Sequence, residues 1–297
     1  MRRLVTDRPP RIFDRAAYRA RRARAQRRHV PGNAPFLVEN VAASLAARIG
    51  AVNRRFSAAL DLGSRPEGFA ALKDLAASWV RASPVAAPGI VVADDEVLPF
   101  ADESFDLVVS ILSLHAVNDL PGTLIQIRRT LKPDGLFLAA LFGGDTLNEL
   151  RQALTTGEAE ALGGASPRIA PFADVRELGA LLQRTGFALS VSDVERTMVH
   201  YAKLGTLFCD LRNLGETNVL TERWPFLPRS VLSAAAEAYA ARFCDAKGRY
   251  RATFDIVYLT GWAPHESQQK PLKPGSATVR LADALGTVEH PTGEKPH

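Results

Sequence analysis

Several stretches of this sequence place polar side chains directly after apolar runs. They are Asp61 to Ser64, Asp94 to Asp95, Ser110, His115 and Asp145. In open α/β sheets ligands bind where strands end, and a glycine in such a turn lets the backbone approach a ligand closely. A carboxylate or a histidine beside the ligand can orient it or accept a proton. These stretches therefore predict a small-molecule site with a candidate base next to it.

The elements that would position these residues alternate along the chain. Apolar runs predict strands at 56–62, 89–93, 105–112 and 136–142, and composition and helical spacing predict helices at 36–49, 68–80 and 120–131. Phe105 to Leu112 is apolar almost throughout, as is typical of a parallel strand covered on both faces. Strands that alternate with helices predict an α/β fold with a parallel, doubly wound sheet.

The pattern changes after Gly143. Helices are expected at 145–162, 174–185, 204–214 and 228–243, and strands within 187–199 and at 253–262. Near the start, Ile12, Ala16, Ala20 and Ala23 have helical spacing between Pro9-Pro10 and Pro31-Gly32. The predicted division is a basic helical arm at 1–35, a core at 36–145, a helical cap with a sixth strand at 146–250, a last strand at 251–264 and a mostly unstructured tail at 265–297, with a short helix near 279–285.

Ordered strings in the core carry a family resemblance. They are D-x-G at 61–63, A-D-x-E-x-L-P-F at 93–100, F-D-L-V-x-S at 105–110 and L-K-P-D-G at 131–135. Each is weak alone, but the ordered set resembles the class I S-adenosylmethionine (SAM) methyltransferases. The resemblance implies a Rossmann-like, mostly parallel sheet with an antiparallel last strand, and SAM as the cofactor.

Three further stretches resemble one branch of that superfamily. They are Ser113 to Pro121, Leu141 to Arg151 and Gly261 to Gln268. The branch comprises mitochondrial complex I assembly factors described as arginine hydroxylases, with their alphaproteobacterial relatives, and it is related to the biotin-pathway methyltransferase of malonyl-carrier protein. The resemblance implies a protein substrate or client, with a complex I subunit as the candidate, and a helical insertion that faces it.

The resemblance also assigns roles to individual residues. Asp94 would accept a hydrogen bond from the adenine amino group, and Ser110 and Leu112 would line the pocket; a turn-capping role for Asp94 and a buried hydrogen-bonding role for Asp61 are the structural alternatives. The full set of expected cofactor-binding residues is Asp61, Gly63, Ser64, Asp94, Asp95, Ser110 and Leu112.

Two departures from the family pattern weaken the predicted SAM site. The glycine-rich loop keeps Gly63, but Arg65 and Glu67 stand where further glycines are usual, and Pro66 removes an N–H donor. No carboxylate occurs around Trp79, where the acid that binds the ribose hydroxyls is expected. Because hydrogen bonds to a charged group contribute about 1.5–3 kcal/mol, SAM binding is predicted to be weak or lost.

His115 is the first candidate for a catalytic base or orienting group, and Asp145 is the second. The alternatives are a packed loop histidine and a helix N-cap for Asp145. Hydroxylation usually uses iron held by two histidines and one carboxylate. His115, His200 and Asp145 or Glu149 have no supporting spacing, so we predict no metal site.

Charge and cysteine content bear on the partners of the basic arm and on the cellular compartment. The 297-residue chain has a formal net charge of +5, and its first 30 residues hold eleven Arg against two Asp. Such an arm suits a docked helix, an acidic partner or an anionic membrane surface, whereas nucleic acid is disfavoured because no aromatic residues interleave with a basic patch. An Arg-rich transit peptide is the further alternative, and Asp7, Asp14 and the lack of serine enrichment argue against it. No apolar run is long enough to span a membrane. With only Cys209 and Cys244, we expect the bacterial cytoplasm, with peripheral membrane association left open.

The sequence is consistent with two functions. The first is a methyltransferase-like enzyme that acts on a protein in complex I assembly, by methyl transfer or arginine hydroxylation. The second is a catalytically inactive pseudo-methyltransferase that serves as a binding or assembly module.

Overall fold

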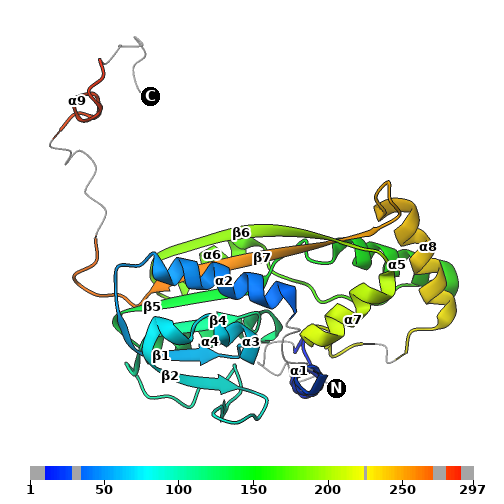
Figure 1. The fold of residues 1–297 in the computed structure, drawn as a ribbon, viewed down its shortest axis with the longest axis horizontal. Helices are drawn as coiled ribbons and strands as arrows, with labels where there is room; N and C mark the ends of the chain where they lie inside the picture. Colours follow the sequence, from blue (N-terminus) through cyan, green and yellow to red (C-terminus); the bar gives the residue numbers. More distant parts are fainter. Residues whose placement is uncertain (1–10, 29–34, 224–225, 270–278, 289–297) are drawn as a thin grey trace, which may run out of the picture. The chain divides into compact units, whose positions relative to one another are not determined.

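The computed structural model describes residues 11–28, 35–223, 226–269 and 279–288 (Figure 1). The chain divides into two units, Met1–Pro264 and His265–His297. The second unit holds a short helix, α9 (Leu281–Leu285), close to the predicted position. The stops predicted at Pro9-Pro10 and Pro31-Gly32, and most of the tail that was expected to lack structure, lie outside the described residues.

The first unit is built on one seven-stranded sheet, in the order β3-β2-β1-β4-β5-β7-β6. In the described sheet β7 pairs antiparallel with both β5 and β6, and the other neighbouring strands pair in parallel. The predicted fold class is therefore confirmed. The strands are β1 (Phe56–Leu62), β2 (Ala76–Ser83), β3 (Val91–Val92), β4 (Phe105–Ile111), β5 (Leu131–Phe142), β6 (Ala188–Tyr201) and β7 (Tyr250–Trp262).

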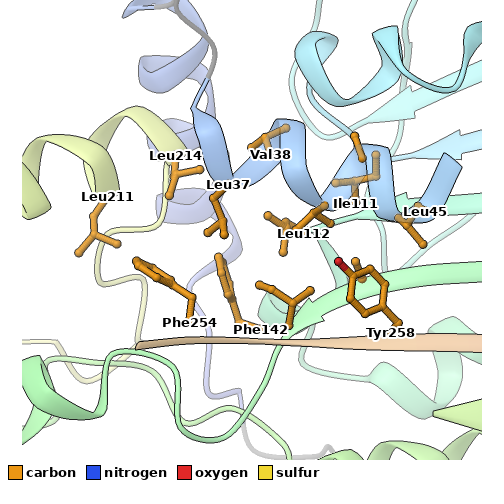
Figure 2. Packing of buried hydrophobic residues seen from close by; sticks show 14 of the residues in the cluster. Leu37, Val38, Leu45, Ile111, Leu112, Phe142, Leu211, Leu214, Phe254 and Tyr258 are labelled. Carbon is orange, nitrogen blue, oxygen red and sulfur yellow. The ribbon is translucent and has the colours of Figure 1, made fainter. Parts of the chain in front are cut away.

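Helices cover both faces of the sheet, so its central strands are buried. On one face α2 (Phe36–Gly50) and α7 (Leu204–Leu214) enclose a core with Leu37, Phe142 and Phe254 (Figure 2). On the other face α4 (Leu120–Thr130) and α6 (Val175–Arg184) pack against a second cluster. All residues of β4 are buried, which explains its continuous apolar run.

One predicted helix is wrong. The helix expected at 68–80 is only α3 (Pro66–Ala70), and a 3-10 turn (Lys73–Leu75) leads from it into β2. Trp79 and Val80 pair in parallel with Ala59 and Leu60 of β1. Tertiary pairing thus overrides the helical preference of the alanines in this segment. Of the strand predicted at 89–93, only the two residues of β3 form a strand, at the edge of the sheet.

A helical pair, α5 (Asn148–Leu162) and α8 (Arg229–Phe243), forms the inserted region. The two helices cross closely at Gly157: a Cβ there would lie 2.5 Å from the backbone nitrogen of Ala235. Glycine is therefore required at this crossing for steric reasons.

The basic arm forms α1 (Arg15–Arg28) and is docked. The residues of α1 that become buried are Tyr18, Arg22 and Ala25, and not the alanines at positions 16 and 20, which stay exposed. The docked helix leads directly to the site.

Candidate functional site

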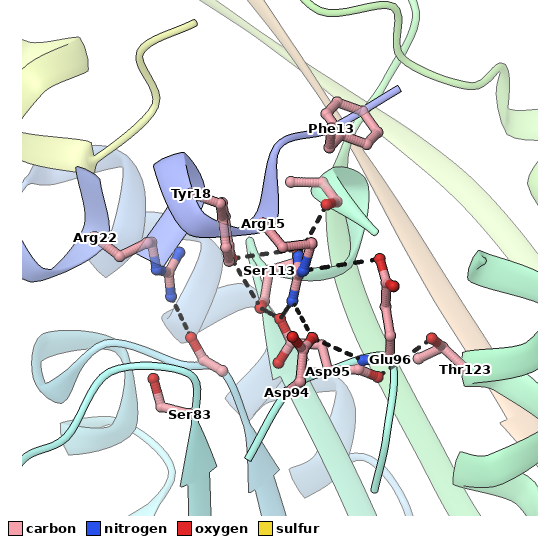
Figure 3. Close-up of polar contacts among 12 residues, drawn as sticks. Phe13, Arg15, Tyr18, Arg22, Ser83, Asp94, Asp95, Glu96, Ser113 and Thr123 are labelled. Atoms are coloured by element: carbon pink, nitrogen blue, oxygen red, sulfur yellow. Dashed lines mark hydrogen bonds and ion pairs between the residues drawn. The ribbon is translucent and has the colours of Figure 1, made fainter. Parts of the chain in front are cut away.

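The helix α1 lies across the carboxyl ends of β1 and β4, where the cofactor site was predicted (Figure 3). Arg15, Tyr18 and Arg22 are spaced by three and four residues, so they share one face of the helix. Figure 3 shows the side chains of Arg15 and Arg22 reaching into the loops that follow the strands.

Arg15 joins the two acids that follow β3. Its Nη2 lies 2.7 Å from Oδ1 of Asp94 and 3.0 Å from Oδ2 of Asp95, and its Nη1 donates to the carbonyl of Ala116. Burial alone would raise the pKa of Asp94, but the Arg15 charge and hydrogen bonds outweigh it and hold that pKa below its usual range. Asp95 is fully buried, and burial raises its pKa despite Arg15. The two neighbouring carboxyl groups thus have pKa values shifted in opposite directions.

Tyr18 and Ser113 extend this hydrogen-bonded network between α1 and the loops after the strands. The Tyr18 hydroxyl lies 3.2 Å from Oγ of Ser113, which donates to Asp95 at 3.2 Å. Gly63 has a φ of +75°, and a Cβ there would come 2.1 Å from the Ser113 hydroxyl. The one glycine that the loop retains is therefore needed both for its backbone conformation and for close approach.

Arg22 bridges the ends of β1 and β4. Its guanidinium donates to the carbonyl of Gly63 and, at 3.0 Å, to the carbonyl of Leu112. Leu112 has a φ of +48°, an unusual conformation for a side-chain-bearing residue. That turn directs its carbonyl toward Arg22, so the predicted residues Gly63 and Leu112 meet at one arginine from α1.

Asp61 and Ser64 keep structural partners beneath the loop. Nε of Arg81 lies 3.1 Å from Oδ2 of Asp61, and Oγ of Ser64 accepts from the amide of Ile111 at 3.3 Å. Burial raises the pKa of Asp61, and hydrogen bonds from Ser64 and Arg81 only partly oppose this. The buried hydroxyl of Ser110 has no hydrogen-bond partner among the described residues. Ser110 is thus a buried polar side chain without a described partner, inside β4.

The end of β2 offers no carboxylate. The strand finishes at Ser83, whose hydroxyl accepts from the amide of Val85 at 3.2 Å. The residue at the end of β2 is therefore a serine, whereas the sequence analysis noted only the lack of a carboxylate around Trp79. Of the groups expected to hold SAM, Asp94 is paired with Arg15, and the carbonyl of Gly63 accepts from Arg22.

His115 lies beside a separate, mostly apolar hollow. It sits on a short 3-10 turn (Leu114–Ala116), and its Nε2 lies 3.0 Å from Oε2 of Glu216. Its ring contacts Phe142 and Phe172 edge-on, with ring centroids 4.8 Å and 5.8 Å apart. The buried Nδ1 has no hydrogen-bond partner among the described residues. His115 is thus oriented by a carboxylate and faces a hollow of about 500 Å³.

Glu216 connects this hollow to the cofactor cleft. Its Oε1 lies 3.9 Å from Nη1 of Arg22. Burial would raise its pKa, but the neighbouring charges of His115, Arg22 and Arg65 hold it below the usual range. Sequence reasoning missed Glu216, Tyr18 and Arg22, because they are distant from the motifs. In the sequence these three residues are distinguished only by lying in segments outside the predicted core.

Asp145 does not reach the hollow. It is largely exposed, and its Oδ2 pairs with Nη2 of Arg196 at 2.5 Å. It does not cap α5 either, since the N-cap of that helix is Leu147. The structure therefore does not bring the two predicted catalytic residues together.

The residues weighed as metal ligands lie apart. His200 lies on β6, while Glu149 is buried against Arg251 and Thr253. Within the described ranges, no group of three or more His, Cys, Asp or Glu side chains could hold a metal ion. Among those same residues, no helix is long and apolar enough to cross a membrane.

Comparison with known proteins gives the class and the family. A family model described as a methyltransferase domain matches residues 68–139. The solved structure of the YcgJ protein from Bacillus subtilis aligns with a TM-score of 0.51 at 14% identity, covering 75% of this chain and 98% of that one. With the sheet order and the cleft, this likeness defines a class I methyltransferase fold.

Curated relatives are more specific. The human protein named arginine-hydroxylase NDUFAF5, mitochondrial, is 41% identical over 300 residues, covering 96% of this chain and 86% of its own length. The malonyl-[acyl-carrier protein] O-methyltransferase of Laribacter hongkongensis is 32% identical, covering 84% of this chain and 90% of its own length. The chain belongs to the NDUFAF5 arginine-hydroxylase family of methyltransferase-like proteins.

One expectation is wrong. The bacterial cytoplasm was inferred from the low cysteine content, but the human, zebrafish and rat relatives are all named as mitochondrial proteins. A low cysteine content is only weak evidence against an oxidising compartment. It does not distinguish the cytoplasm from other reducing compartments.

Proposed function

We propose that this chain is a SAM-dependent, methyltransferase-like enzyme that acts on a protein in respiratory complex I assembly, modifying an arginine side chain. The observation that supports this most is the convergence of Gly63, Asp94, Asp95 and Leu112 at the carboxyl edge of the sheet, next to a hollow that holds His115. The 41% identical relative named as an arginine hydroxylase supports the arginine substrate.

In this proposal each end of the cleft has a defined task. Asp94 accepts from the adenine amino group, and Ser110 lines the adenine pocket with its free hydroxyl. Bound SAM would supply an electrophilic methyl group beside the sheet edge. Because the end of β2 lacks an acid, binding is weaker than in a chain with one; one lost charge-assisted hydrogen bond corresponds to about a tenfold or greater loss of affinity.

The hollow would receive the client side chain. Phe142 and Phe172 line the hollow, and a cation close to an aromatic ring is attracted to it. Glu216 sets the orientation of His115, whose unpartnered Nδ1 is then able to hold or accept a proton.

The decisive experiment combines binding with product analysis. SAM is titrated into the full chain by calorimetry, with Asp94→Asn as the cleft variant and Glu195→Asn, an exposed carboxylate on β6, as the matched control. Mass spectrometry of complex I subunits from cells with and without the chain then identifies the product. A CH2 unit on arginine indicates methyl transfer, and an oxygen atom indicates hydroxylation.

A second candidate is a binding module that does not use SAM. It is favoured by the contacts of α1, since Arg15 and Arg22 already occupy Asp94, Asp95 and the Gly63 carbonyl. The two candidates differ in one result. If SAM does not bind and Asp94→Asn leaves complex I assembly intact, the module is correct and the enzyme proposal is wrong.

A further inference from the structure

The strand β6 forms one edge of the sheet (Figure 1). Within the part of the chain that the structure describes, β6 pairs with β7 on one side and with no strand on the other. It is 14 residues long and contains neither proline nor lysine, two residues that commonly keep an edge strand from pairing. A register shift near Ala188 interrupts its start, but from Val191 to Tyr201 its pairing with β7 is regular. The outer backbone groups of this stretch are therefore open to a further strand.

The two faces of β6 differ in chemistry. Asp193 and Glu195 lie on the face that α2 covers, because the residues of β7 opposite them belong to the core under that helix. Side chains alternate along a strand, so Val194 and Met198 lie on the other face. Both are unusually open for apolar residues, with exposed fractions of 46% and 58%. The edge thus has an acidic row, Asp193 and Glu195, and an apolar row, Val194 and Met198.

The acidic row keeps a net negative charge. Its two carboxylates share one guanidinium: the Nη atoms of Arg48 lie 2.8 Å from both oxygens of Asp193 and 2.8 Å from Oε1 of Glu195. The side chains of Asp193 and Glu195 are 39% and 50% exposed, so a partner can reach them. On the other face Arg196 is held by Asp255 at 2.6 Å and 2.7 Å. This edge is therefore acidic, although the whole chain has a formal net charge of +5.

The charges disfavour a second copy of this chain at the edge. Two antiparallel β6 strands related by a two-fold axis would keep like faces together, because directly opposite side chains point the same way. Pairing centred on this stretch would bring the two acidic rows together, and like charges directly opposite are destabilising. The complementary partner is a strand with positive charges on one face and apolar side chains on the other.

We propose that β6 is a docking edge for an extended, basic segment of a partner protein. The segment adds a strand to the sheet, with lysine or arginine side chains beside Asp193 and Glu195 and apolar side chains on the opposite face. In such strand addition the main-chain hydrogen bonds supply affinity, and the alternating side chains supply specificity. Ion pairs at a half-exposed edge contribute more to the choice of partner than to the strength of binding. The inference does not depend on the use of SAM.

The first test uses two synthetic peptides and the full chain. In one ten-residue peptide lysine alternates with valine and threonine, and in the other glutamate replaces each lysine. We expect the lysine peptide to bind about tenfold or more tightly and to slow hydrogen exchange of the outer amides between Val191 and Val199. The net charge of +5 would favour the glutamate peptide, so a preference for lysine reports the local charge of the edge.

Variants separate strand addition from attraction between charges. A lysine peptide N-methylated at alternate residues keeps its charges but cannot form the hydrogen-bond ladder, so it should not bind. Val194→Lys should weaken binding of the unmethylated peptide about tenfold, and Asp193→Asn should weaken it by a smaller factor that shrinks as salt is added. Ile125→Lys is the matched control, because Ile125 lies on α4 and is 47% exposed. It should leave binding unchanged.

Three results would overturn the proposal. They are no binding of the lysine peptide, equal binding of its N-methylated form, and binding without slower exchange in β6. In each case the acidic row would instead act as a charge barrier that keeps the edge unpaired. Sedimentation supplies a further check: a dimer of the full chain that Val194→Lys abolishes would place a second copy at the edge, and the proposed partner would be wrong.

Discussion

Nε2 of His115 lies 3.0 Å from Oε2 of Glu216, and the other oxygen of the same carboxylate faces Arg22 in the cofactor cleft. One side chain from the loop after α7 thus connects the cleft to the aromatic hollow. Because Asp94 and Asp95 are held by Arg15 and not by Glu216, a change at His115 should affect the hollow without disturbing these two carboxylates.

We predict that His115→Asn slows client modification about a hundredfold, the effect expected when a positioned acid or base is removed, with no change in SAM affinity. Asp145→Asn is the matched control, because Asp145 pairs with Arg196 away from the hollow. Rates are measured in single turnover and affinity by calorimetry. Equal rates for His115→Asn and wild type would leave His115 as a packed loop residue.

The Glu216 pairing should produce a specific pH dependence of stability. Because its pKa is lowered in the folded protein, the ionised carboxylate stabilises the fold above the unfolded pKa of about 4.3, and this contribution is lost as pH falls through the lower, folded value. Melting of Glu216→Gln and wild type should differ most near neutral pH and converge in acid. A difference that grows in acid would contradict the lowered pKa.

Docking of α1 should contribute to the free energy of unfolding. Tyr18 is 1% exposed, so Tyr18→Ala should lower the free energy of unfolding by about 3–5 kcal/mol, as for other buried aromatic residues. Tyr18→Phe should cost much less, since it loses only the hydroxyl contact with Ser113. Both are measured by chemical denaturation.

Deletion of residues 1–28 distinguishes the docked helix from a nucleic-acid tether. If α1 supports the fold, the melting temperature falls. An unchanged melting temperature, together with the loss of a salt-sensitive binding to DNA, would show instead that the arm acts as a free electrostatic tether.

The crossing of α5 and α8 gives a prediction that does not involve the site. Gly157→Ala should destabilise the fold by about 1–3 kcal/mol, because its Cβ would meet the backbone of Ala235. Gly205→Ala is the matched control: no atom lies within 4 Å of its Cβ position, and α7 should gain about 0.5–1 kcal/mol of stability. Thermal melting measures both, and a neutral Gly157→Ala would mean that the helices can move apart.

The sequence by itself determined most strands of the sheet and most of its helices. Local patterns suffice for this, because β4 is apolar throughout and α7 has a clear helical period that ends at a glycine. It also located the carboxyl edge, since Gly63, Asp94 and Leu112 each follow a strand. The strand β2 was not predicted from the sequence, because its strand conformation depends on pairing with β1 and not on its own residues.

Only the tertiary structure decided how the cleft is covered. Arg22 reaches Gly63 across 41 positions of sequence, and His115 reaches Glu216 across 101. No local period links such pairs, so their meeting follows from the docking of α1 and from the position of α7. The sequence therefore identifies the charged residues around this site, but long-range packing determines which of them pair.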